Sequence, residues 1–137
     1  MGSVIAEITL RNGADIIRAS DGHIPEQNIR SLTVTALVDT GAMTLVINKE
    51  LQKKLGLAVI GTRTVTLAGG SKSSCDVVEP VQICWKDRTS LIRPLVMPNE
   101  EDILLGVIPL EEMDLIVDPV NKKLVGAHGD EMMGMIK

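Results

Sequence analysis

The chain has 137 residues, enough for one domain with a core of ordinary size and too few for a two-lobed enzyme in a single chain. Its 14 basic and 18 acidic residues give a net charge of −4, and the dispersed Lys and Arg argue against nucleic acid as a partner. Phe and Tyr are absent and there is one Trp, so aliphatic side chains must build the core, which favours strands.

The first twenty residues lack the apolar block of a secretory signal. Charged side chains interrupt them at Glu7, Arg11, Asp15 and Arg18, and no later run approaches the length of a membrane span. We therefore expect a soluble, cytoplasmic protein with no membrane partner. In a reducing compartment, Cys75 and Cys84 are expected to be free thiols.

The N-terminal third predicts three strands. Residues 4–10 are expected to form the first strand, 11–13 a turn, and 14–19 the returning strand of a hairpin. A polar loop over residues 20–28 then leads to the apolar-rich run 32–38, which predicts a buried strand.

An Asp-Thr-Gly-Ala sequence at residues 39–42 closes this buried strand. It places the Asp39 carboxylate where the chain turns sharply. Two facing carboxylates can share one proton, so that one activates water as a base while the other holds the proton. No second Asp-Thr-Gly or Asp-Ser-Gly occurs in the sequence, so a site of this kind would require two chains.

A short helix is predicted after the acidic turn. Asn48 is its expected N-cap, Leu51 and Leu55 lie four apart on one face, and Gly56 ends it. Residues 62–67 then alternate in polarity, and after a glycine-rich interruption residues 75–78 resume an extended pattern, which predicts a hairpin with a flexible tip.

The C-terminal half predicts shorter elements. Residues 81–85 are expected as a strand, 86–88 as a turn, and 91–97 as the returning strand, part of which Pro94 confines to a sheet edge. We expect a brief buried strand at 103–106, a short helix at 107–113, and a final hairpin at 115–125.

Three of these features, taken in order, resemble the retropepsins, the retroviral-type aspartic peptidases, and most closely their small bacterial relatives. They are Leu-Val-Asp-Thr-Gly-Ala at 37–42, the Gly-tipped hairpin at 68–71, and Leu-Leu-Gly at 104–106 before a short helix. The resemblance covers a protease domain at 4–126 and leaves 127–137 as a C-terminal tail. It implies an all-β fold, a closed β-barrel with one or two short helices, active as a homodimer with its site on the twofold axis.

The resemblance also implies roles for individual residues. Asp39 is the expected catalytic residue, the Thr40 hydroxyl braces the two loops across the dimer axis, and Gly41 and Ala42 complete a tight active-site loop. The expected flap, which closes over a substrate, comprises Ala68, Gly69, Gly70 and Ser71. Leu104, Leu105 and Gly106 are expected to support the catalytic loop from behind. A peptide or protein substrate is implied, with no metal or organic cofactor.

Other interpretations of these motifs are weaker. Asp-Thr-Gly alone, or Gly69-Gly70 alone, is also an ordinary turn sequence. Residues 69–73 lack the ending of a phosphate-binding loop, an aspartyl-phosphate enzyme would need further acids for magnesium, and His23 and His128 lack metal-ligand spacing. Two functions therefore remain: an aspartic endopeptidase built from two chains, and a non-catalytic module of the same fold that dimerises or binds peptides.

Overall fold

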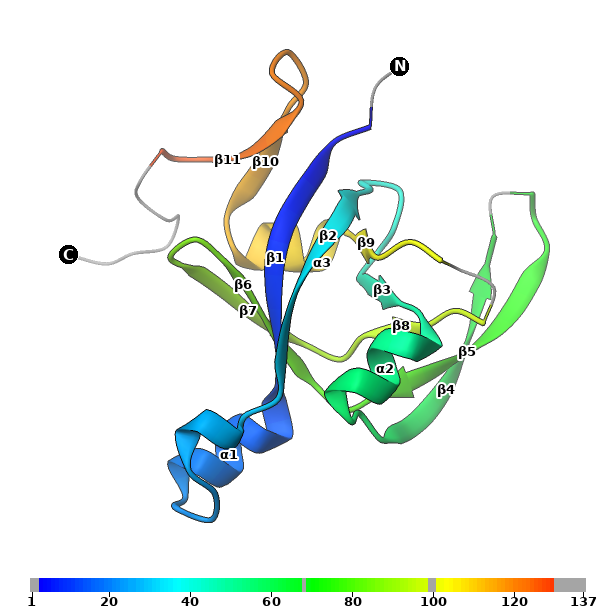
Figure 1. Cartoon of the computed structure of the whole chain (residues 1–137). Helices are drawn as coiled ribbons and strands as arrows, with labels where there is room; N and C mark the ends of the chain where they lie inside the picture. Colours follow the sequence, from blue (N-terminus) through cyan, green and yellow to red (C-terminus); the bar gives the residue numbers. More distant parts are fainter. Residues whose placement is uncertain (1–2, 68, 99–100, 130–137) are drawn as a thin grey trace.

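The computed structural model describes residues 3–67, 69–98 and 101–129, and strands dominate this part of the chain (Figure 1). The strands are β1 (Ile5–Asn12), β2 (Ser31–Val38), β3 (Leu45–Ile47), β4 (Val59–Thr66), β5 (Lys72–Val78), β6 (Val81–Trp85), β7 (Arg88–Ile92), β8 (Leu95–Val96), β9 (Leu104–Leu105), β10 (Leu115–Asp118) and β11 (Lys123–Gly126). The helices are α1 (Gly13–Ser20), α2 (Lys49–Leu55) and α3 (Val107–Glu112), with a 3-10 turn at Glu26–Asn28.

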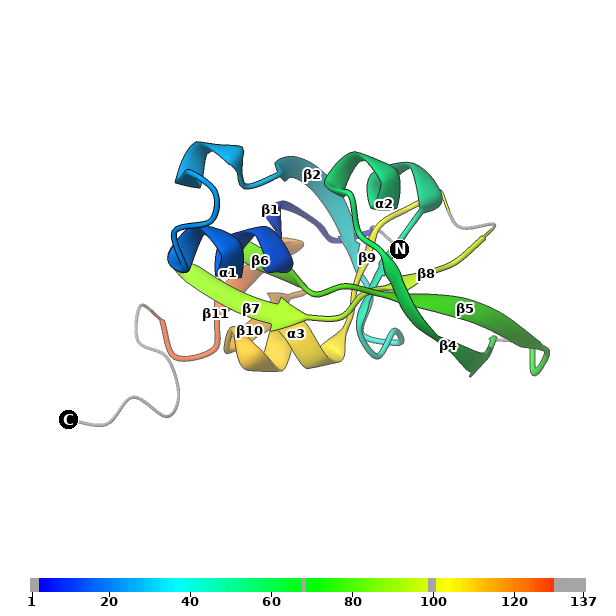
Figure 2. The same cartoon turned by 90° about the horizontal axis from the view of Figure 1, so that it is seen from below.

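Nine strands form one hydrogen-bonded sheet in the order β4-β5-β8-β3-β9-β2-β1-β6-β7, while β10 and β11 pair separately. Figures 1 and 2 show that this sheet is strongly curled, so its inner face can bury an aliphatic core. Alternate residues of β1 point into that core, where Ile8, Leu10, Ile83 and Leu105 are almost fully buried. The mostly β class is therefore confirmed. Closure of the sheet into a barrel stays a prediction.

The predicted helix after the acidic turn is confirmed as α2. The Leu51 N–H donates to the Asn48 side-chain oxygen at 2.8 Å, and Gly56 ends the helix in the left-handed region at φ 65°. Leu51 and Leu55 are its buried residues, as their spacing indicates. The hairpins β4–β5, β6–β7 and β10–β11 and the short helix α3 are also confirmed.

The predicted returning strand at 14–19 is wrong, because α1 occupies this segment. Asn12 ends β1 and caps the helix: its side-chain oxygen accepts the Asp15 N–H at 3.0 Å, and its Nδ2 donates to the Leu55 carbonyl at 2.7 Å. The Asp15 carboxylate is buried and accepts hydrogen bonds from the Arg30 side chain and backbone. Residues 11–13 therefore form a strand end and a helix start, not a hairpin turn.

The predicted single strand at 91–97 is also wrong. β7 already begins at Arg88, directly after the turn, and it ends at Ile92. Pro94 separates it from β8, which pairs with β3 and β5 in another part of the sheet. Proline cannot donate a ladder hydrogen bond, so the chain leaves one pairing here and joins another.

Residues 127–129 continue beyond β11 and are tied to the rest of the fold. The Ala127 N–H donates to the Asp114 carbonyl at 2.9 Å, and the Arg88 Nη2 donates to the Gly129 carbonyl at 2.6 Å. The boundary between a domain at 4–126 and a tail at 127–137 stays a prediction. No helix in the described ranges is long and apolar enough to cross a membrane.

Candidate active site

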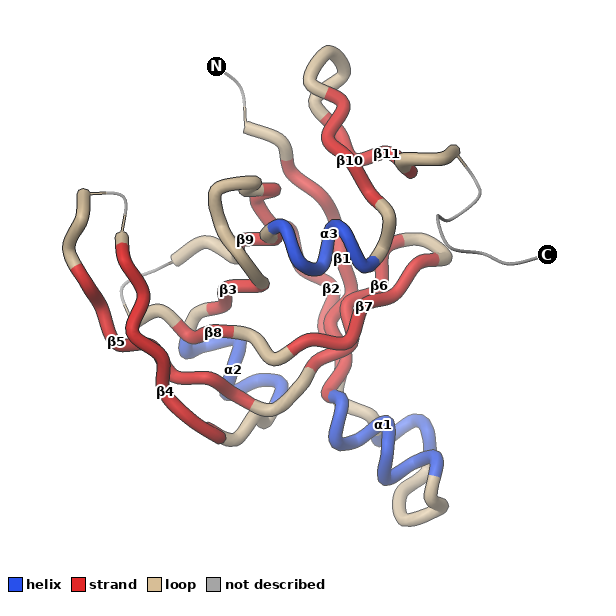
Figure 3. The backbone as a smooth tube through the Cα atoms, turned by 180° about the vertical axis from the view of Figure 1, so that it is seen from behind, coloured by secondary structure: helices blue, strands red, loops and turns tan. Residues whose placement is uncertain are grey.

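The central strands of the sheet position Asp39. β9 lies between β2, with which it pairs in parallel, and β3, with which it pairs antiparallel (Figure 3). Leu37 pairs with Leu104 and Val38 with Leu105, and the Asp39 N–H then donates to the Leu105 carbonyl at 3.0 Å. The residue after β2 is thereby fixed at the middle of the sheet, where its side chain is half-buried.

The loop that follows is closed by its own hydrogen bonds. One Asp39 carboxylate oxygen accepts the Gly41 N–H at 2.8 Å, and the Asp39 carbonyl accepts the Ala42 N–H at 3.0 Å. A Cβ at Gly41 would lie 3.1 Å from that carboxylate oxygen, which explains a glycine here. Within the part of the chain that the structure describes, the second Asp39 oxygen has no hydrogen-bond partner and can bind water.

The predicted support segment lies directly behind this loop. Leu105 is buried, and Gly106 packs so closely that a Cβ there would lie 2.5 Å from the carbonyl oxygens of both Ala42 and Thr44. The first N–H groups of α3 bind the loop from the same side: Val107 donates to Ala42 at 2.9 Å and Ile108 to Met43 at 2.8 Å. The loop is therefore anchored at both ends, while Thr40 and Gly41 stay exposed.

The predicted flap lies at the tip of the β4–β5 hairpin, which extends away from the rest of the sheet (Figure 2). The Leu67 N–H donates to the Ser71 carbonyl at 2.7 Å, and Gly70 adopts a left-handed φ of 87°. A Cβ at Gly69 or Gly70 would meet no atom within 4 Å. Ala68 lies outside the described residues. The tip is thus exposed, and no hydrogen bond between described residues joins it to the Asp39 loop.

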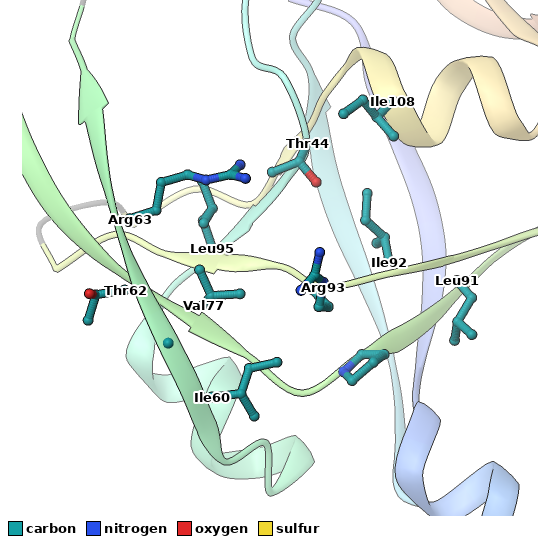
Figure 4. Close-up of a pocket in the computed structure, with 12 residues that line it drawn as sticks. Thr44, Ile60, Thr62, Arg63, Val77, Leu91, Ile92, Arg93, Leu95 and Ile108 are labelled. Carbon is teal, nitrogen blue, oxygen red and sulfur yellow. The ribbon is translucent and has the colours of Figure 1, made fainter.

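A groove of about 640 Å³ lies between the β4–β5 hairpin and the segment that runs from β7 to β8 (Figure 4). Thr44 and Ile108, which flank the acidic loop, lie at one end of it. Its walls are mainly aliphatic, with Arg63 and Arg93 as the charged lining residues. Asp39 does not line it, so the groove adjoins the acidic loop without containing it.

Sequence reasoning did not find this groove. Its lining residues come from β4, β5, β7, β8, α3 and the connecting segments at Thr44, Pro80 and Arg93, and no local motif joins them. Only the pairing of distant strands brings them together.

The other reactive side chains of the described residues form no second centre. Burial raises the pKa of the Cys75 thiol and of the Cys84 thiol, and both cysteines are free, as predicted. The His128 Nδ1 lies 2.7 Å from an Asp114 carboxylate oxygen, and both His128 and His23 are exposed. Within residues 3–67, 69–98 and 101–129, no three His, Cys, Asp or Glu side chains cluster as metal ligands would.

The sequence was compared with models of known protein families. A family model described as aspartyl protease matches residues 26–107, more than half of the chain. The matched range begins before β2, includes the acidic loop and the β4–β5 hairpin, and ends at the first residue of α3. Among curated proteins, no relative matches the sequence.

Proposed function

Because the chain belongs to the aspartyl protease family, we propose that it is an endopeptidase that uses the Asp39 carboxylates of two chains in a homodimer. The observation that carries this proposal is the anchored acidic loop. β9 holds the loop at Asp39, and α3 holds it at Ala42 and Met43. One Asp39 carboxylate oxygen has no hydrogen-bond partner among the described residues and is open to a ligand. The matched family supports the reaction class, and the single Asp-Thr-Gly supports the need for a partner chain.

In the proposed reaction the two Asp39 carboxyl groups share one proton. The ionised group accepts a proton from a bound water, whose oxygen attacks the carbonyl carbon of the peptide bond. The protonated group donates its proton to the carbonyl oxygen, which gives a tetrahedral diol. The group that accepted the water proton then passes it to the amide nitrogen, the C–N bond breaks, and one diol hydroxyl returns its proton to the other Asp39 as the carboxylic acid product forms. The hydrogen bond from the Gly41 N–H would orient each carboxylate for these transfers.

The exposed part of the loop is suited to meet a second copy. Thr40 and Gly41 are exposed in the single chain, so another loop can approach them. The Thr40 hydroxyl can donate and accept a hydrogen bond at once, as a brace between two loops requires. Gly69, Gly70 and Ser71 would then cover a bound peptide as the flap, with Ala68 beside them. The homodimer would be built from a domain at 4–126.

The direct test is Asp39→Asn. Asparagine keeps the side-chain oxygen that accepts the Gly41 N–H, so the fold and dimer should persist, while the base is lost. We expect cleavage of a peptide library, followed by mass spectrometry, to be abolished. Asp118→Asn is a matched control, because the Asp118 Oδ1 accepts the Val120 N–H at 3.0 Å in a similar turn outside the site. The control should keep its activity, and wild-type turnover by Asp39→Asn would disprove the proposed role.

The need for two chains has its own test. Specific activity should fall on dilution in parallel with the dimer fraction measured by sedimentation. Excess Asp39→Asn chain should suppress wild-type activity, because mixed dimers hold a single Asp39. A fully active monomer would contradict the two-chain site. A wild-type dimer that cleaves no peptide would favour the non-catalytic module.

A further inference from the structure

Two arginines in the groove differ from every other arginine in the chain. The sequence contains six, and all six lie in the described ranges. The four outside the groove each have partners: Arg11 donates to Gln82, Arg18 and Arg30 to Asp15, and Arg88 to three backbone carbonyls. Arg63 and Arg93 form no ion pair or side-chain hydrogen bond with any described residue.

These two guanidinium groups come from opposite sides of the groove. Arg63 belongs to β4, and Arg93 follows β7 (Figure 4). Among the residues that the structure describes, no Asp or Glu lines the groove, although the whole chain has a net charge of −4. The Glu112 carboxylate lies beside the groove but accepts the Leu91 N–H at 2.9 Å. The groove is therefore a positively charged site on an acidic protein.

The remaining walls restrict which anion fits. Ile60, Leu91, Leu95 and Ile108 provide apolar surface around the two cations. A nucleic acid would require more phosphate contacts and stacking aromatics than this groove offers. A peptide with an acidic side chain fits both the two arginines and the apolar walls. Its carboxylate can bind guanidinium groups, while neighbouring atoms of the peptide cover the aliphatic walls.

We propose that this groove selects peptide substrates with a Glu or Asp side chain, which Arg63 and Arg93 bind at a position removed from the scissile bond. This inference rests on the proposed function. Thr44 and Ile108 join the groove to the Asp39 loop, and Asp39 itself does not line the groove, so the acidic side chain binds beside the reacting peptide bond and not at it.

The expected preference is moderate because both arginines are exposed. Exposed ion pairs contribute up to about 1 kcal/mol each, which corresponds to roughly 5-fold in a binding or rate constant. Two arginines on one carboxylate therefore predict a preference of up to roughly 25-fold for the acidic peptide over its amide counterpart. The preference should weaken as salt is added.

The test uses peptides with acetylated and amidated ends, so that side chains carry the only carboxylates. Pairs that differ by Glu against Gln, or Asp against Asn, are compared at each position. The proteins are wild type, Arg63→Gln, Arg93→Gln and the double variant. Lys53→Gln, on the exposed face of α2, is the matched control for a lost positive charge outside the groove. The measured quantity is the ratio of kcat/KM for each acidic and amide pair.

We expect one position at which the wild type and Lys53→Gln prefer the acid, with intermediate ratios in the single variants and a ratio near one in the double variant. Cleavage without an acid preference, or a preference that survives in the double variant, overturns this inference and leaves the peptidase intact. Binding of the same peptides to Asp39→Asn, with and without the two arginines, decides the inference if no cleavage occurs. Arginine-dependent binding of acidic peptides would then uphold it, and its absence would overturn it.

Discussion

Replacing Gly106 with alanine would push a methyl group into the backbone of the acidic loop. The new Cβ would lie 2.5 Å from the carbonyl oxygens of Ala42 and Thr44, and 2.8 Å from the Ala42 carbonyl carbon. Close carbon–oxygen contacts in proteins lie at about 3.3 Å, so the loop would have to move by roughly 0.8 Å. Because Gly106 has a φ of −95°, the conflict is one of space and not of backbone angle.

The energetic cost follows from what must move. Overpacking a tight site costs about 1–3 kcal/mol, and weakening the Val107 to Ala42 hydrogen bond adds roughly 1 kcal/mol. We therefore expect the free energy of unfolding to fall by about 3 kcal/mol, which a domain of typical stability, about 5–15 kcal/mol, survives. A displacement of this size near the reacting groups should also lower kcat/KM by roughly 100-fold.

Urea unfolding followed by Trp85 fluorescence measures the first effect, and peptide cleavage measures the second. Gly61→Ala is the matched control for stability, because the new methyl group would meet no atom within 4 Å and the φ of Gly61 is not positive. The control should unfold at nearly the wild-type urea concentration. An alanine at position 106 that leaves both the unfolding midpoint and the cleavage rate unchanged would refute the close contact behind the loop.

Features specified by neighbouring residues could be predicted from the sequence. Asn48 begins α2 and Gly56 ends it through contacts within one or two helical turns. The alternation of polar and apolar residues identified β6 and the β4–β5 hairpin. The end of β2 at Asp39 was also evident, since an apolar run meets a turn sequence there. Each of these signals involves residues close together in the sequence, so it can be recognised without knowledge of the fold.

The segment that forms α1 was predicted wrongly because contacts between residues distant in sequence stabilise it. α1 depends on the hydrogen bond from Asn12 to Leu55 and on the ion pair between Asp15 and Arg30, which are distant in sequence. The sequence did contain a clue, because an Asn followed three residues later by an Asp, with Arg18 in the last turn, is a helix pattern. The alternative interpretation, that Asn-Gly is a hairpin turn, obscured it.

The groove could not have been predicted, because its two sides meet only through tertiary pairing. The pairing of β4 with β5 places Arg63 on one side of the groove, and the segment that connects β7 to β8 places Arg93 on the other. Their lack of partners among the described residues is a property of the folded chain alone. Similarly, the parallel pairing of β2 with β9 brings Leu105 behind Asp39 across a long sequence separation.

Three further predictions concern the hairpin tip, Arg88 and Asp15. Replacing Gly69 and Gly70 with valine should impair cleavage severely but lower the free energy of unfolding by only about 1–2 kcal/mol, mainly because valine is strained at the left-handed backbone angle of Gly70. Cleavage kinetics and thermal melting, measured on the same variant, test both effects, and unchanged cleavage would remove the tip from the site. Arg88→Met should lower the free energy of unfolding in urea by about 3 kcal/mol, because the carbonyls of Met113, Asp114 and Gly129 lose their buried donor. An unchanged unfolding midpoint would show that these carbonyls find other donors. Asp15→Asn should cost about 2 kcal/mol at neutral pH, since it removes a buried carboxylate from its ion pair with the partly exposed Arg30. The Arg30 side chain holds the pKa of Asp15 below its ordinary value of 3.8, so this stabilisation is present above pH 3.8 and is lost as pH falls through the lower pKa of the folded state. The wild type and Asp15→Asn should therefore converge in stability in acid, and a gap that stays constant from pH 7 through the acid range would show that the ion pair is not its source.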